Sequence, residues 1–254
     1  MLRARVIPVL LLRDGGLVKT VKFGHPTYLG DPINIVKIFN DKEVDELVLL
    51  DIAASAERRR PPFEFLAQVT TECFMPLCYG GGVRTVEDVR TLVSLGVEKV
   101  AVNTYAAENP AFLRAAADLV GSSSVVASID VKRKLLGGYE VVTLGGRRRT
   151  GLDPVRFAQE AERQGAGEVL LNSVDRDGTM AGYDLELVRQ VAGAVDIPVV
   201  ACGGAGSVAD LAAVVRTAGA SAAAAGSMFV FQGRHRAVLV NTPAESELRT
   251  AFST

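Results

Sequence analysis

The chain lacks several residue types on which common kinds of functional site depend. Its 254 residues include no tryptophan, two histidines, His25 and His235, and three cysteines, Cys73, Cys78 and Cys202. Two distant histidines and three cysteines without paired spacing exclude a histidine-based metal cluster and a disulfide framework. We therefore expect no metal and no cofactor. Unpaired cysteines suit the reduced thiols of the cytoplasm, which is the expected location.

The chain also has little net charge and no long apolar run. Its formal net charge is −1, and its basic tracts, Arg58–Arg60 and Arg147–Arg149, contain no interleaved aromatic residue. This composition argues against nucleic acid as a partner. No apolar run reaches the ~18 residues that a membrane helix needs. Because Arg13 and Asp14 stand where a signal peptide would have its small-residue cleavage site, we expect the N-terminal apolar segment to be a strand.

Short apolar runs alternate with segments that are typical of helices, and 48% of all residues are hydrophobic. Unbroken apolar runs are typical of parallel strands buried on both faces, and ~250 residues is the usual size of a (β/α)8 barrel. We predict one α/β domain over residues 1–254, a (β/α)8 TIM barrel, with an open doubly wound sheet as the alternative. The predicted strands span 6–12, 46–51, 75–79, 99–103, 124–130, 168–172, 197–201 and 221–225.

Helices are predicted between these strands. Asp31-Pro32 provides an N-cap and a proline at the first helical position, and Asn109-Pro110 and Asp153-Pro154 begin two further helices. The segment from Arg13 to Gly30 is predicted to be a long loop, and Tyr139 to Leu144 an extra β-hairpin arm. Other helices are expected over 61–73, 85–95 and 185–194, and near 244–251.

The two halves of the chain resemble each other. Gly81 aligns with Gly203 and Thr104 with Ser227, which predicts half-repeats of about 1–120 and 121–230, with a C-terminal helix after them. Each half has a glycine turn that opens a helix, and a strand that ends in a hydroxyl residue. Glycine permits close backbone approach and a helix N-terminus binds anions. We therefore expect two phosphate sites bridged by one phosphorylated small molecule, although such a glycine turn is also common without a ligand.

Several long segments resemble the cyclase subunit of imidazole glycerol phosphate synthase. The resemblance implies a (β/α)8 barrel of two similar halves that binds a glutaminase subunit of the class I glutamine amidotransferase type. It also implies that ammonia passes through the barrel and that a doubly phosphorylated substrate is cleaved and cyclised. It covers residues 1–231 and rests on GDP (30–32), DELVLLDI (45–52), GGGVRTVED (80–88), EKVAVNT (98–104), GAGEVLLNSVDRDGT (165–179), GYDLELVR (182–189) and ACGGAGS (201–207).

The resemblance assigns residues to the site. The catalytic face matches Lys19, Asp51 and Asp130, with Asp130 as the general base, and Asn172 stands where threonine is usual. The alternative for Asp51 and Asp130 is that they cap loops at their strand ends. Carboxylates at the carboxyl ends of barrel strands favour acid–base chemistry. The two phosphate sites correspond to Gly82, Asn103 and Thr104, and to Asp177, Gly178, Gly204, Gly226 and Ser227.

Four charged residues begin strands one, two, four and six, namely Arg5, Glu46, Lys99 and Glu168. They match the ring of alternating charges that the family places at the N-terminal end of its barrel, where ammonia enters. Two cations and two anions can satisfy one another and leave a narrow polar gate. The alternative interpretation is ordinary surface charge at the starts of strands.

One catalytic group of the family is missing. The family carries a Cys-Leu-Asp run on its first strand, and that aspartate is the general acid, whereas this chain has Val9-Leu10-Leu11. The internal repeat indicates the same loss, because Leu11 aligns with Asp130. Leucine cannot donate a proton, and loss of a positioned general acid lowers a rate ~10²–10⁴-fold. The resemblance therefore implies weak cyclase activity or none.

The segments 7–23 and 231–243 are similar to a paralogous subgroup that also lacks this aspartate. That subgroup accompanies amidotransferases that place nitrogen on bacterial surface-polysaccharide sugars. Membership would imply a barrel that passes ammonia from its glutaminase to a third, sugar-amidating protein. Two alternatives stay open, a functional cyclase of histidine biosynthesis with a substitute general acid, and a non-catalytic phosphate-binding barrel.

Overall fold

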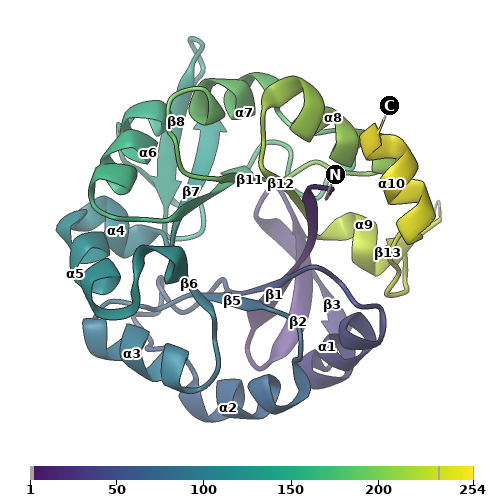
Figure 1. Ribbon diagram of the computed structural model, residues 1–254, viewed down its shortest axis with the longest axis horizontal. Helices are drawn as coiled ribbons and strands as arrows, with labels where there is room; N and C mark the ends of the chain where they lie inside the picture. Colours follow the sequence, from purple (N-terminus) through teal and green to yellow (C-terminus); the bar gives the residue numbers. More distant parts are fainter. Residues whose placement is uncertain (1–2, 234, 254) are drawn as a thin grey trace.

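The computed structural model describes residues 3–233 and 235–253, and it contains a closed barrel of parallel strands (Figure 1). The last barrel strand pairs in parallel with the first, which confirms the (β/α)8 barrel and excludes the open doubly wound sheet. Around the barrel the strands are β1 (Arg5–Arg13), β4 (Leu47–Asp51), β5 (Leu77–Gly80), β6 (Lys99–Val102), β7 (Val125–Arg133), β10 (Glu168–Ser173), β11 (Val199–Cys202) and β12 (Ala222–Ala225).

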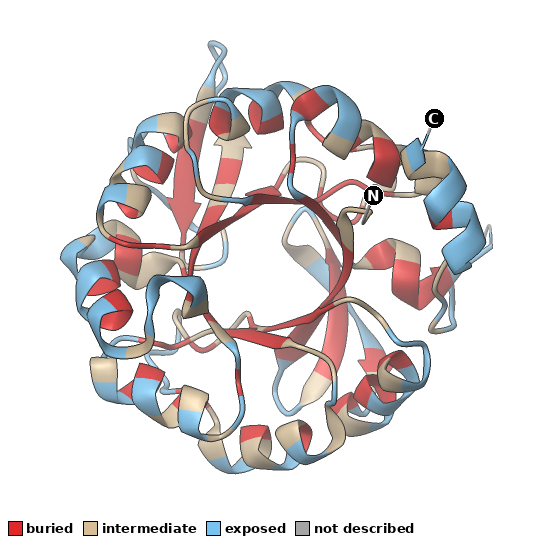
Figure 2. Cartoon of the chain, viewed as in Figure 1, coloured by how far each residue is buried: buried red, intermediate tan, exposed pale blue. Residues whose placement is uncertain are grey.

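Helices surround the barrel and present one buried face to it (Figure 2). Asp31 and Asp153 accept hydrogen bonds from the first turns of α1 and α6, and Pro32 and Pro154 follow them, as predicted. The outer helices are α1 (Pro32–Asp41), α2 (Phe63–Glu72), α3 (Val86–Ser94), α5 (Ala111–Val120), α6 (Pro154–Arg163), α7 (Leu185–Ala192), α8 (Val208–Ala218) and α10 (Glu245–Ser253), with a 3₁₀ turn, η1 (Ser122–Ser124). No helix in the described ranges is long and apolar enough to cross a membrane.

Two short helices, α4 (Thr104–Glu108) and α9 (Ser227–Val230), were not predicted from the sequence. Each begins at the hydroxyl residue that follows a barrel strand. They occupy equivalent places in the two halves, as do the capping boxes of Thr85 with Asp88 on α3 and of Ser207 with Asp210 on α8. The internal repeat of the sequence therefore has a counterpart in local structure.

The prediction of a long loop over residues 13–30 was wrong. This segment is a β-hairpin of β2 (Gly16–Val21) and β3 (Gly24–Gly30), and β2 pairs antiparallel with β1. The tight turn between β1 and β2 places Asp14 and Gly15 in the left-handed region, which aspartate and glycine tolerate better than most residues. The extra β-hairpin arm predicted at Tyr139 to Leu144 is confirmed, because β8 (Tyr139–Thr143) pairs antiparallel with β7 and also with β9 (Arg148–Arg149).

Successive side chains along each barrel strand point to opposite faces, and this divides the core into two layers. One set of side chains faces the helices and the other fills the barrel interior, as strand geometry requires. On β1 the interior positions are Ile7, Val9 and Leu11. The interior layer continues through Val48, Cys78, Ala101, Val126, Leu170, Val200, Ala222 and Ala224. A last small hairpin, β13 (Phe231–Gln232) with β14 (Ala237–Val238), follows α9.

Candidate functional site

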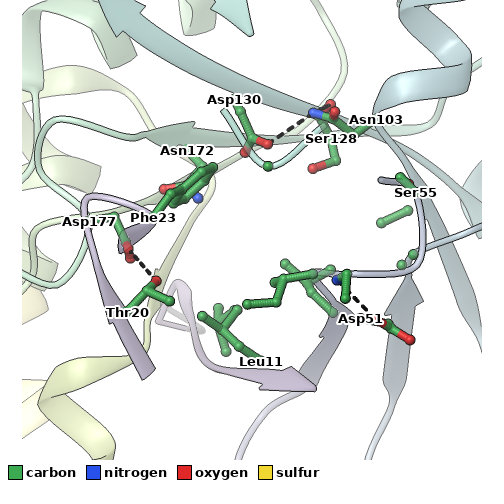
Figure 3. Close-up of a pocket in the computed structure, with 18 of the residues that line it drawn as sticks. Leu11, Thr20, Phe23, Asp51, Ser55, Asn103, Ser128, Asp130, Asn172 and Asp177 are labelled. Carbon is green, nitrogen blue, oxygen red and sulfur yellow. Dashed lines mark hydrogen bonds between the residues drawn. The ribbon is translucent and has the colours of Figure 1, made fainter. Parts of the chain in front are cut away.

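A pocket lies at the carboxyl ends of the barrel strands, and the β2–β3 hairpin contributes to its wall (Figure 3). Active sites of (β/α)8 barrels lie at this end, because the βα loops there vary without disturbing the barrel. The structure brings all the predicted catalytic and phosphate-site residues together as pocket lining, namely Lys19, Asp51, Gly82, Asn103, Thr104, Asp130, Asn172, Asp177, Gly178, Gly204, Gly226 and Ser227.

Asp130 lies on β7 and faces the pocket beside two amides. The Nδ2 of Asn103 donates to Asp130 Oδ2 at 3.3 Å and to the Ser128 carbonyl oxygen at 2.9 Å. Burial, and secondly the charge of Asp177, raise the pKa of Asp130 to about 7, against a lowering by a hydrogen bond from Asn172. A carboxyl group with a pKa near 7 can both accept and return a proton at neutral pH.

Asn172 leaves one polar atom unsatisfied. Its side chain is 9% exposed, and its buried Oδ1 accepts no hydrogen bond from the described residues. A buried acceptor without a donor costs free energy, so this oxygen is available to an N–H or O–H group of a ligand. Threonine, which the family usually has here, would offer a hydroxyl instead of a carboxamide.

Leu11 faces the same interior as Asp130, from the other side of the pocket (Figure 3). Its side chain is 8% exposed and belongs to the interior cluster with Val9 and Val18. On β1 it occupies the register position that corresponds to Asp130 on β7, since Ile7 and Val126 both face inward four residues earlier. The position at which the family resemblance implies a general acid is therefore part of an apolar wall.

Asp51 is held by its own turn. Its Oδ1 accepts from the backbone N–H groups of Ala53 and Ala54, each at 3.0 Å, and Arg59 Nη1 lies 3.2 Å from its Oδ2. Figure 3 shows the carboxylate turned away from the centre of the pocket. These contacts fit the loop-capping alternative, and a catalytic role for Asp51 stays a prediction.

Lys19 projects from β2 toward the second predicted phosphate site, which includes Asp177. Its Nζ donates to Asp177 Oδ1 at 2.8 Å, and the Thr20 hydroxyl lies 3.1 Å from Asp177 Oδ2. Both side chains of the Lys19–Asp177 pair are less than 10% exposed. This ion pair joins the β2–β3 hairpin to the loop after β10. The backbone N–H of Lys22 also donates to the Asp177 carbonyl oxygen at 2.9 Å, which is a second link between the two segments.

Close packing explains the glycines of the two predicted phosphate sites. Gly82 and Gly204 both have positive φ, +74° and +118°. A Cβ on Gly82 would lie 2.3 Å from the Arg59 carbonyl oxygen, and a Cβ on Gly204 would lie 2.2 Å from that of Gly182. A side chain at either position would collide with the backbone of a neighbouring segment, so both turns require glycine.

Sequence reasoning missed two residues that the fold brings to this region. Phe23, at the tip of the β2–β3 hairpin with a φ of 63°, lines the pocket (Figure 3). Arg236, near the C-terminus, donates to the Gly178 carbonyl oxygen at 2.9 Å. A hairpin prediction for 16–30 would have placed Phe23 near the pocket. Arg236 reaches its position through tertiary contacts that no local pattern specifies.

The four charged strand-start residues form one connected group at the opposite end of the barrel. Arg5 forms ion pairs with Glu46 and Glu168, and Lys99 Nζ lies 2.9 Å from Glu46 and 2.8 Å from Glu168. Burial lowers the pKa of Lys99, but hydrogen bonds and charge from Glu168 and Glu46 outweigh it and raise that pKa. Alternating charges thus close a ring, as predicted from their strand positions.

Only small and apolar side chains lie between this ring and the pocket among the described interior residues. Cys78 is 2% exposed, and burial raises the pKa of its thiol far above the ordinary value, which keeps it uncharged. No group of three or more His, Cys, Asp or Glu side chains in the described part of the chain could hold a metal ion. The barrel therefore has charged groups at both ends and an apolar middle.

Comparison with known proteins defines the family of this barrel. The family "Histidine biosynthesis protein" matches residues 5–236. A Pseudomonas aeruginosa protein with the provisional name imidazole glycerol phosphate synthase subunit hisF2 is 53% identical, over 98% of this chain and 99% of its own. The chain belongs to the imidazole glycerol phosphate synthase HisF family of synthase subunits.

Other relatives extend the same comparison. A Vibrio vulnificus protein with the provisional name hisF3 is 47% identical, over 99% of this chain and 97% of its own. The imidazole glycerol phosphate synthase subunit HisF of Alkaliphilus metalliredigens is 45% identical, over 90% of this chain and 91% of its own. The similarity thus spans the barrel from end to end.

Proposed function

We propose that this chain is the ammonia-conducting barrel subunit of a glutamine-dependent amidotransferase, and that it does not itself perform the family's cyclase reaction. The observation that carries the proposal is a combination of two features. The charge ring at the N-terminal end is complete, with Lys99 bound to both Glu46 and Glu168, while an apolar Leu11 occupies the position of the general acid.

The barrel interior suits the passage of ammonia as a neutral molecule. Apolar walls disfavour ammonium, because a buried unpaired charge is costly, and the interior side chains Ile7, Val48, Val200 and Cys202 belong to one buried apolar cluster. Small interior side chains, such as that of Ala101 on β6, leave more room inside the barrel than large ones would. Entry would require Lys99 to leave one of its two carboxylates, which gives the ring the properties of a gate.

A glutaminase subunit is the proposed source of the ammonia. It would dock at the N-terminal face of the barrel, over the ring. Phe74, in the loop between α2 and β5 at this face, is 79% exposed, and exposed aromatic side chains are typical anchors of protein interfaces. Its backbone N–H donates to Asn40 Oδ1 at 3.0 Å, which holds the loop in place.

The nitrogen acceptor would be bound by a third, sugar-amidating protein at the pocket end of the barrel. This part of the proposal is supported by the resemblance of segments 7–23 and 231–243 to the polysaccharide-associated subgroup, and by relatives named hisF2 and hisF3, numbers typical of additional copies. The two glycine turns would hold the phosphate groups of a small-molecule ligand, one at Gly82 and Thr104, the other at Gly204 and Ser227.

Reconstitution tests the proposal. The purified barrel, mixed with the glutaminase subunit of the same organism, should form a stable complex by size-exclusion chromatography and stimulate glutamine hydrolysis. Phe74→Ser should weaken complex formation about tenfold or more, as loss of an aromatic anchor does, while Leu135→Ser, at the exposed tip of the β7–β8 arm beyond the carboxyl end of β7, should not. Failure of the parent barrel to bind any such glutaminase would favour the non-catalytic phosphate-binding alternative.

A further inference from the structure

The last small hairpin brings a cation to the second predicted phosphate site. Phe231 pairs with Val238 and Gln232 with Ala237 in an antiparallel hairpin. Arg236 has a φ of 50° and folds back over the Phe231 ring, with its guanidinium carbon 4.8 Å from the ring centroid. This cation–π contact fixes the direction of the side chain.

The Arg236 guanidinium reaches two residues of that site. Its Nη2 donates to the Gly178 carbonyl oxygen at 2.9 Å and to the Ser227 hydroxyl at 3.4 Å. Both Gly178 and Ser227 line the pocket. A guanidinium has five N–H donors, and within the described ranges Nη1 and Nε of Arg236 have no protein acceptor. These donors are available to a bound anion.

Charge at the site depends on Arg236. Lys19 and Asp177 form a buried pair whose charges cancel, and no carboxylate of the described residues lies within ion-pair distance of Arg236. Arg236 is exposed at its position, so an incoming anion can reach it without breaking a salt bridge. Without it, a dianionic phosphate would meet the Asp177 carboxylate with only its own Lys19 to compensate.

We propose that Arg236 is a phosphate-binding and specificity-determining residue, which completes the second site for the phosphate monoester end of a small molecule. The inference rests on the proposed function only in placing a phosphorylated ligand in the pocket. Guanidinium groups bind phosphate oxygens through paired, directional hydrogen bonds. The site therefore prefers a phosphate dianion to a neutral hydroxyl group at the same place.

Crystals of the purified barrel equilibrated with increasing inorganic phosphate test this inference without any glutaminase. In the parent, phosphate should bind at the second site within hydrogen-bond distance of Arg236 and Ser227. Arg236→Gln should raise the concentration needed at that site about tenfold or more, and leave the site at Gly82 and Thr104 unchanged. Arg236→Lys should show an intermediate loss, because it keeps the charge and loses the planar fork.

Arg176→Gln is the matched control. It removes the same charge from the loop after β10, but the Arg176 guanidinium points to another partner, because its Nη1 donates to the Ala181 carbonyl oxygen at 3.2 Å and not to Gly178 or Ser227. It should bind phosphate like the parent. Equal second-site occupancy in Arg236→Gln and the parent, or parent phosphate that avoids Arg236, would overturn the inference. If Arg236→Gln disorders the hairpin, Arg236→Lys at increasing ionic strength decides, since a charge-based site weakens with salt.

Discussion

Leu11 decides what chemistry remains at the centre of the pocket. Asp130 is the proposed general base, and Lys19, Asn103 and Asn172 line the same pocket, so the proposed function keeps a site that can bind and orient a ligand. The bond-breaking step of the family's reaction needs a proton from the opposite wall, where Leu11 presents methyl groups. Binding without turnover is the result expected from this arrangement.

Restoring the acid at this position should restore part of the family's chemistry. Leu11→Asp, combined with Val9→Cys to rebuild the neighbourhood, should raise cyclase turnover with ammonium above the parent level, by up to ~10²-fold. Leu10→Asp is a poor alternative because that side chain faces the helices. Activity equal to the parent in a folded Leu11→Asp variant would mean that more than the acid has been lost. The measurement is product formation from the histidine-pathway substrate.

The pH dependence of stability should report the environment of Asp130. Its pKa is raised to about 7 by burial first and by Asp177 second, so ionisation opposes folding. The folded state keeps the proton while the unfolded state loses it near pH 4, and stability therefore falls as pH rises from about 4 to about 7. Asp130→Asn removes this cost. Relative to the parent, its free energy of unfolding should rise by about 2–4 kcal/mol between pH 4 and pH 8.

Urea unfolding at the two pH values measures this effect. Asp118→Asn, at an exposed position on α5, is the control and should leave the pH dependence unchanged. A difference between Asp130→Asn and the parent that does not change with pH would show that the Asp130 carboxyl group keeps an ordinary pKa.

At the scale of elements, apolar runs and helix-starting prolines were sufficient to locate the barrel strands and most outer helices. The β2–β3 hairpin escaped prediction because Gly16–Val21 and Gly24–Gly30 contain three glycines and a proline, which are typical of loops. Pairing with β1 overrides these local preferences. The short helices α4 and α9 escaped because Thr104 and Ser227 were assigned only as strand-end hydroxyl residues.

The glycine turns should tolerate no side chain. Gly204→Ala would place a Cβ 2.2 Å from the Gly182 carbonyl oxygen at a φ of +118°. Gly137→Ala, at the tip of the β7–β8 arm, also has positive φ but meets no atom within 4 Å. Gly204→Ala should therefore lower the free energy of unfolding by about 1–3 kcal/mol more than Gly137→Ala. If urea unfolding showed equal losses of unfolding free energy in the two variants, the turn at Gly204 would accommodate a Cβ without strain.

At the scale of the whole molecule, the barrel joins two differently constructed ends. Strand-start residues Arg5, Glu46, Lys99 and Glu168 could be predicted to share the N-terminal end, because parallel strands begin together. Their closure into one ion-paired ring depends on side-chain geometry that only the structure gives. Arg236 likewise reaches the second predicted phosphate site through tertiary contacts of the β13–β14 hairpin. Phe23 could have been placed near the pocket only if the β2–β3 hairpin had been predicted.

Opening the charge ring should uncouple glutamine hydrolysis at one end of the barrel from nitrogen transfer at the other. Lys99→Ala removes both contacts of Lys99 and leaves Glu46 and Glu168 with Arg5 alone. In the complex with glutaminase and acceptor protein, glutamine hydrolysis should continue while a larger share of the ammonia escapes into solution. Glutamate formed and free ammonium released are measured together, and Lys37→Ala, a surface lysine paired with Glu72, should behave like the parent. Unchanged transfer efficiency in Lys99→Ala would refute the gate.

The central claim is that this barrel conducts ammonia without performing cyclase chemistry. The most direct test is turnover of the histidine-pathway substrate by the purified parent chain, with saturating ammonium in place of glutaminase. Since Leu11 cannot supply the proton, we expect substrate binding, visible as protection against thermal unfolding, and no product above background. Turnover in the ordinary enzymatic range of ~1–10³ s⁻¹ would contradict the account and identify the chain as a cyclase with a substitute general acid.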